Sequence, residues 1–148
     1  MEKHKTCSFF GHRKIEITEE LKQKLKKIIE DLIVSHNVFT FLFGSRSDFN
    51  SLCYLIVTEL KQKYSSVKRI FYTCKSETCI LESKRQKLEE ALNRTTNQKI
   101  TLLGFEEEFE HKTKYTAGRL SYVERNQAII NDSYYCVFYY DKINSYRT

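Results

Sequence analysis

Short apolar runs alternate along the chain with longer segments whose apolar residues recur every three or four positions. The runs lie at 5–10, 38–43, 68–74, 99–103 and 134–140, and most of them contain several aromatic or β-branched residues. Runs of this length and composition predict buried strands. The longer segments predict helices, because their apolar residues fall on one helical face.

Four segments carry the helical pattern. The strongest spans 18–35, where lysines cover the face opposite to the apolar one. The segment 47–64 is apolar on more than one side and predicts a buried helix, whereas 76–93 is weakly apolar and predicts an exposed one. The last helix is predicted at 115–132. The glutamate-rich run at 106–110 is typical of a solvated loop or a helix start.

Five strands that alternate with helices predict an α/β fold. Such a chain builds a mostly parallel five-stranded sheet with right-handed crossovers and helices on both faces, which is a three-layer sandwich. In these sheets ligands bind at the carboxyl ends of the strands, where the strand order reverses. We therefore expect a site in the loops that follow the strands.

The turn after the second strand has the strongest chemical signal. Gly44, Ser45 and Arg46 follow the strand, and a helix begins near Ser47 or Asp48, whose side chains can cap it. A strand that leads into a helix in this way directs backbone N–H groups and the positive end of the helix dipole at one point. Arg46 adds a cation that can form a forked contact with a phosphate. The pattern indicates anion binding, or a strand–helix connection that serves only stability.

The first strand is followed by a second candidate loop. Gly11 comes directly after this strand, and His12 and Arg13 are two potential cations beside it. The same residues also suit a simple turn with solvated basic side chains.

The last predicted helix carries a third group of candidates. Arg119, Tyr122, Arg125 and Asn126 recur at spacings of three, four and seven, so they share one polar face. Such a face can bind a phosphate together with a ribose or a base, and it also fits a salt-bridged helix surface.

Composition narrows the classes of partner. The chain of 148 residues has the length of one domain, and its net charge is +6. This charge attracts anions, but the basic residues are spread through the helices without a basic tail, so the sequence does not favour nucleic acid as a partner. No apolar run approaches the roughly 20 residues that cross a bilayer, so we expect no membrane association and a cytoplasmic location.

The five cysteines occur without a CxxC spacing, and most of them lie within apolar runs. We expect reduced and mostly buried thiols. Cys74 and Cys79, taken with His111, match no zinc-binding pattern, so the sequence predicts neither a metal nor a cofactor.

Several ordered motifs resemble those of a known family. They are Thr6–Arg13, the glycine turn Phe43–Leu52, the helix end Leu60–Tyr64, and Tyr122–Ser133, which leads into a strand ending at Tyr140-Asp141. The ordered set is similar to the YpsA-like branch of the SLOG superfamily, the Rossmann-like group that includes the DprA/Smf and LOG proteins. It covers nearly the whole chain.

This resemblance implies a single Rossmann-like domain over 1–148 that binds nucleotides or nucleotide-derived ligands. Some relatives act as phosphoribohydrolases on nucleoside monophosphates, others are sensors or DNA-processing proteins, and many form homodimers. The chain departs from the family in having one glycine in the central turn and Asn50 in place of an acidic residue. It also lacks the PGGxGTxxE signature and the last glycine-rich loop and helix. These departures weaken the hydrolase interpretation more than the binding one.

Three hypotheses follow. The first is a sensor or regulatory domain that binds a nucleotide or another phosphorylated small molecule through Gly11, His12, Arg13, Gly44, Ser45, Arg46, Asn50, Arg119, Tyr122, Arg125 and Asn126. The second is an N-glycosidase or phosphoribohydrolase, for which Glu124 and Asp141 are the candidate carboxylates. The third is a protein-interaction module without a ligand. The sequence does not decide whether a reaction is catalysed.

Overall fold

The computed structural model describes residues 2–44, 47–73, 107–110 and 119–140. These residues form the 3-10 helix η1 (Lys3–Lys5), the strands β1 (Thr6–Phe10), β2 (Thr40–Phe43), β3 (Lys68–Thr73), β4 (Glu107–Glu110) and β5 (Tyr135–Phe138), and the helices α1 (Glu19–His36), α2 (Asp48–Lys63) and α4 (Arg119–Asp132). None of the helices in these ranges has the length and apolar character needed to cross a bilayer.

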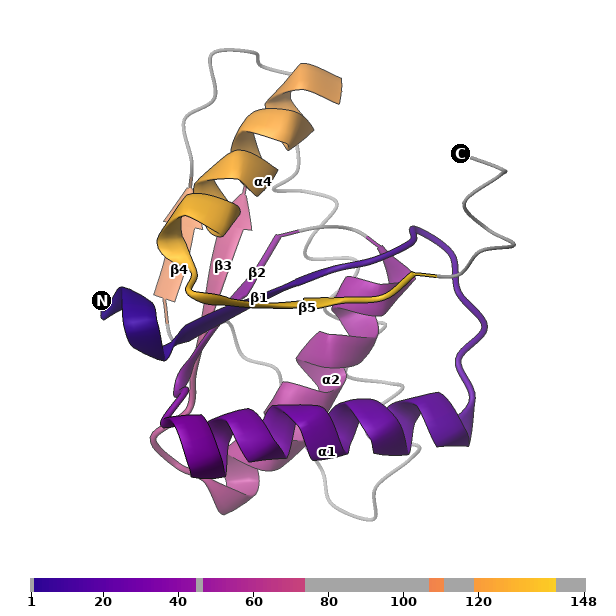
Figure 1. Cartoon of the computed structure of the whole chain (residues 1–148). Coiled ribbons are helices and arrows are strands. Elements are labelled where there is room, and N and C mark those ends of the chain that lie inside the picture. The colour runs from indigo at the N-terminus through magenta and orange to yellow at the C-terminus, as the bar shows by residue number, and fades with distance from the viewer. Residues whose placement is uncertain (1, 45–46, 74–106, 111–118, 141–148) are drawn as a thin grey trace.

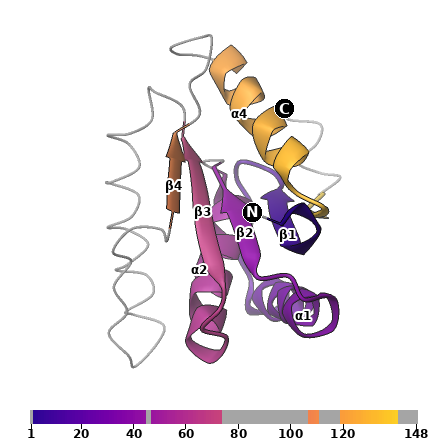
Figure 2. The ribbon, with the colours of Figure 1, turned by 90° about the vertical axis from the view of Figure 1, so that its left-hand side faces the viewer.

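The strands form one sheet in the order β4-β3-β2-β1-β5, and every neighbouring pair is parallel. Helices α1 and α2 cover one face of this sheet, and α4 lies on the other face (Figures 1 and 2). The described residues therefore form an α/β sandwich of the Rossmann-like kind, as the alternating pattern predicts. The order reverses at β1, because β2 lies on one side of it and the last strand lies on the other.

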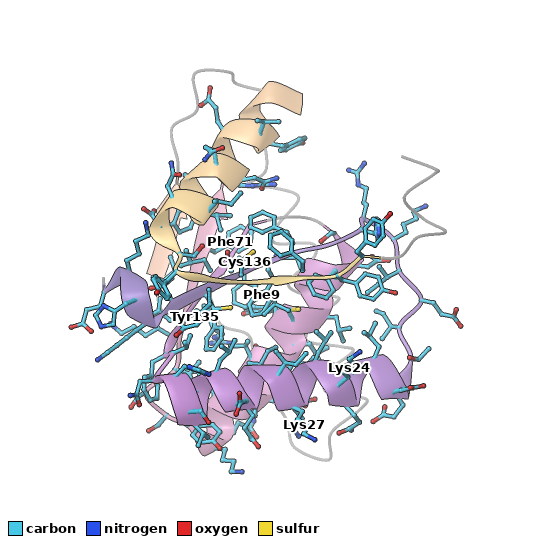
Figure 3. The ribbon with its side chains drawn as sticks, viewed as in Figure 1. Phe9, Lys24, Lys27, Phe71, Tyr135 and Cys136 are labelled. Atoms are coloured by element: carbon cyan, nitrogen blue, oxygen red, sulfur yellow. The ribbon has the colours of Figure 1, made fainter. Side chains whose placement is uncertain are left out.

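Alternation along the strands divides the core into two parts. The Phe9 ring stacks on the rings of Phe41 and Phe43, at centroid distances of 5.9 and 5.4 Å. Phe9 points from the sheet toward α1 and α2 (Figure 3), and these rings belong to the core cluster that includes both helices. On the opposite face, Leu42 and Ile70 pack with Ile129 from α4. Because successive side chains in a strand point to opposite faces, these central strands are apolar on both sides.

The two helices on the first face follow their sequence patterns. In α1 the buried residues are Leu25, Ile29 and Ile33, and the Thr18 side chain accepts a hydrogen bond from the Leu21 N–H. Asn37 ends this helix in the left-handed region with φ of 55°. Helix α2 is buried on most sides, as predicted, because it packs against β1 and β2 of the sheet and against α1 beside it.

One strand differs from its prediction. The run at 106–110 is predicted as a solvated loop or helix start, but Glu107–Glu110 forms β4 and pairs in parallel with β3. The strand forms because its backbone groups pair with those of β3, although its sequence has no apolar pattern that predicts a strand. Charged residues are common on edge strands. The predicted strand at 99–103 and the predicted helix at 76–93 lie outside the described residues.

Candidate functional site

The carboxyl ends of β1, β2 and β5 lie side by side because these strands are parallel neighbours. We use the term rim for these strand ends, the residues that directly follow them and the part of α4 that faces them. Both glycine loops picked out from the sequence belong to the rim, since Gly11 follows β1 and Gly44 follows β2.

Two hydrogen bonds join the loop after β1 to the start of α2. The Asp48 N–H donates to the Arg13 carbonyl oxygen at 2.7 Å, and the Ile15 N–H donates to Asp48 Oδ2 at 3.3 Å. The backbone of Arg13 is therefore held at the first turn of α2, while its side chain is exposed. The fold brings the two predicted anion-facing loops together.

The first turn of α2 is capped and fixed to β1. Ser47 Oγ accepts a hydrogen bond from the Asn50 N–H at 3.1 Å, which is the capping contact expected for a serine at this position. Asn50 is buried, and its side-chain Nδ2 donates to the Phe9 carbonyl oxygen at 3.1 Å. Asn50 therefore positions the start of the helix against the end of β1.

Both rim glycines allow a close approach that a larger residue would block. A Cβ at Gly11 would lie 2.6 Å from Cγ of the Phe49 ring. A Cβ at Gly44 would lie 2.7 Å from Ile129 Cδ1, 2.9 Å from the Tyr72 carbonyl oxygen and 3.2 Å from Arg125 Cδ. Glycine at position 44 thus lets α4 pack directly on the turn after β2.

Arg125 is the charged residue that this packing places at the rim. Its side chain is 3% exposed, and the guanidinium lies over the Tyr122 ring, 5.2 Å from the centroid. The Asn126 Oδ1 atom lies 3.4 Å from Nε and from one terminal nitrogen of the same guanidinium. The predicted polar face of α4 therefore brings Tyr122, Arg125 and Asn126 together, and the Cδ atom of Arg125 lies beside Gly44.

A second buried arginine shows a different arrangement. Arg69, near the start of β3, donates to the Tyr54 hydroxyl at 3.3 Å and to Thr58 Oγ1 at 3.0 Å. Its guanidinium also lies 5.4 Å from the centroid of the Tyr54 ring. Arg69 thus joins β3 to α2 at the opposite end of the strands, away from the rim.

Aromatic residues at the end of β5 were missed by the sequence analysis. His12 lies beside the rings of Tyr139 and Tyr140, at centroid distances of 6.0 and 5.9 Å. Tyr139 in turn stacks on Phe49 at 5.5 Å. The only sequence signal was the aromatic composition of the last strand, which predicted burial and gave no sign of a site.

For several of the site residues predicted from the sequence, the side-chain position is not described. Ser45, Arg46 and Asp141 lie outside the described residues, and so does the side chain of Arg119, whose backbone begins α4. Glu124 is partly buried on α4 next to Arg125.

The thiols in the described ranges are not poised for nucleophilic chemistry. Burial raises the pKa of Cys7 and of Cys53, and it also raises the pKa of the partly buried Cys136. A thiol is a nucleophile only as the thiolate, so these groups are protonated near neutral pH. Within the same ranges, no three His, Cys, Asp or Glu side chains gather as a metal site would require. Cys74, Cys79 and His111 lie outside them.

Comparison of the sequence with protein-family models and with curated proteins gives no match. The rim combines a capped helix start, two close-packed glycines and the buried side chain of Arg125.

Proposed function

We propose that the rim binds a nucleotide or another phosphorylated small molecule, in a sensor or regulatory role. The observation that carries this proposal is the position of Arg125, which is buried with its Cδ atom beside Gly44. Helix α2 begins shortly after the same turn, at Asp48. The positive end of the helix dipole and the Arg125 side chain thus lie near the same turn, which supports the proposal.

A helix start and an arginine side chain near one turn are both features that favour a negatively charged ligand. Asp48 supplies one negative charge in the first turn of α2, with its Oδ2 accepting from the Ile15 N–H. A phosphate at the turn would add the charge that both helix starts and arginine bind well. The net charge of +6 favours the approach of such a ligand.

The resemblance to the YpsA-like branch supports the same class of ligand. Its motifs include Gly11, Gly44 and Arg125, which the fold gathers at the rim. The only glycine of the central turn, Gly44, makes room for α4. In the family, further glycines let backbone N–H groups contact the phosphate. Here we propose that Arg125 makes this contact instead.

Titration calorimetry tests the proposal with inorganic phosphate, ribose 5-phosphate, nucleoside monophosphates, cyclic nucleotides and ADP-ribose. We expect Arg125→Gln to weaken binding about ten- to a hundredfold, the loss typical of a hydrogen bond to a charged group. Lys27→Gln is the matched control, because Lys27 is exposed on the side of α1 away from the sheet (Figure 3). It removes the same charge far from the rim and should leave binding unchanged.

A second variant makes the test independent of any folding defect in the first. Asp48→Asn keeps an oxygen that can accept from the Ile15 N–H but removes a negative charge beside the anion. We expect it to strengthen phosphate binding about two- to fivefold, from the size of charge effects at helix ends. If none of these ligands gives heat with the wild-type chain, or if both variants bind like wild type, the proposal is wrong.

A further inference from the structure

A graded aromatic cluster occupies the rim on the side of β1 away from Gly44. Phe49 is fully buried and stacks on Tyr139 with an interplanar angle of 26°. His12 meets the Tyr139 ring edge-on at 89° and lies beside Tyr140 at 40°. The rings thus pass from the core outward, and Tyr140 at the outer end is 70% exposed.

The position of this cluster matters more than its composition. His12 follows β1, and Tyr139 and Tyr140 follow β5, so the rings lie at the ends of the two strands where the sheet order reverses. This is the place where open α/β sheets bind ligands. The cluster is held there by backbone pairing, because the Tyr139 N–H donates to the Phe10 carbonyl oxygen at 3.0 Å.

The aromatic cluster and the Gly44–Arg125 turn lie on opposite sides of the end of β1. Neighbouring strands are about 4.8 Å apart, so the ends of β2 and β5 are separated by roughly 10 Å. A free phosphate cannot reach both places. A ligand with an anionic group at one end and a planar ring at the other can do so.

We propose that the rings of Tyr140 and His12 form a stacking surface for the base of the bound nucleotide. This inference rests on the proposed function, because it assigns the phosphate to the Gly44–Arg125 turn. Exposed aromatic rings are the usual partners of nucleobases in proteins, since every base has a π-face. The rigid support from Tyr139 and Phe49 lowers the entropy lost when the base stacks.

The test compares ligands with and without a base. AMP, ribose 5-phosphate and adenosine are titrated into the wild-type chain and into Tyr140→Ala, Tyr140→Phe and Tyr134→Ala. Tyr134 is the matched control, because it is 65% exposed at the other end of β5, away from the rim. Thermal unfolding of each variant measures any change in stability.

We expect Tyr140→Ala to weaken AMP binding about five- to 150-fold and to leave ribose 5-phosphate binding unchanged. Tyr140→Phe, which keeps the ring, and Tyr134→Ala should bind AMP like wild type. The inference is overturned if ribose 5-phosphate binds as tightly as AMP, or if Tyr140→Ala alters only the thermal midpoint.

Failure of the proposed function gives a different result. In that case neither inorganic phosphate nor ribose 5-phosphate binds, and Arg125→Gln changes nothing. If adenosine still binds and Tyr140→Ala abolishes its binding, the stacking surface stands without a phosphate site. If no probe binds, both proposals are wrong.

Discussion

At the scale of single residues, the rim depends on what Gly44 lacks. A side chain there would meet Ile129, Arg125 and the Tyr72 carbonyl oxygen, and the last of these belongs to backbone that cannot move independently of β3. From the sequence, Gly44 was a candidate because it lies between a strand and a helix, where backbone N–H groups can bind an anion. The structure adds a steric reason, which depends on α4 and could not be read from the local sequence.

We predict that Gly44→Ala destabilises the protein by about 1–3 kcal/mol, the usual cost of forcing extra atoms into a packed site. The free energy of unfolding is measured by urea denaturation. Lys27→Ala on the wet face of α1 serves as the control and should change it by no more than about 0.5 kcal/mol. Wild-type stability in Gly44→Ala would mean that α4 does not pack on this turn.

At the scale of elements, patterns that depend on neighbouring residues in the sequence predicted well. Helices α1 and α2 and the strands β1, β2, β3 and β5 all follow local apolar periodicity. The polar face of α4 was also predicted, because spacings of three and four place Tyr122 and Arg125 together. Strand β4 was missed, since its formation depends on the open edge of β3 and its own sequence is acidic. The His12–Tyr140 contact was missed for a similar reason, because it arises only when β5 pairs with β1.

Among the strands that the structure describes, β5 has an unpaired edge that could bind another strand. Within the described residues β5 is an edge of the sheet, and 134–140 contains neither a charged residue nor proline. Phe138 is 71% exposed on it, and Tyr134 is exposed beside its start. Edges without protecting charges tend to pair with another strand, and a second copy can do so about a two-fold axis. We therefore propose a homodimer formed through β5.

We predict that the wild-type chain forms a concentration-dependent dimer, measured by sedimentation equilibrium. The dimer should be weak, because two exposed rings from each copy bury well under the roughly 1,000 Å² that a stable interface needs. Phe138→Lys should shift the population to monomer by placing like charges on the paired edges. Val34→Lys is the control, since Val34 is 62% exposed on α1, on another surface. A monomer at every concentration, or equal dissociation by both variants, would contradict the prediction.

At the scale of the whole molecule, the buried thiols link stability to pH. Cys7 and Cys53 have an ordinary pKa of 9.0, and burial raises it in the folded state. Below pH 9 the thiols are protonated in both states, so their full contribution is present. Above it the unfolded chain loses protons that the folded chain keeps, and stability therefore falls as the pH rises.

We predict that the free energy of unfolding decreases between pH 9 and pH 10.5 by up to about 1.4 kcal/mol per pH unit for each buried thiol. Lysine and tyrosine also titrate in this range. The measurement is therefore the difference in slope between wild type and the Cys7→Ala, Cys53→Ala double variant, from urea denaturation under reducing conditions. Identical slopes would show that these thiols ionise as readily in the folded protein as in the unfolded chain.

The strand order also bears on how the molecule is assembled in the cell. Strand β1 is made first, yet one of its two neighbours, β5, is among the last parts of the described chain to be synthesised; the hydrogen bond between Ser8 and Ser133 spans 125 positions. While the ribosome is still adding the middle of the chain, the side of β1 that later pairs with β5 has no partner strand. The nascent protein therefore exposes the unpaired backbone N–H and C=O groups of β1 until β5 has been synthesised. During this interval the chain is most prone to aggregate, and a chaperone would protect it most.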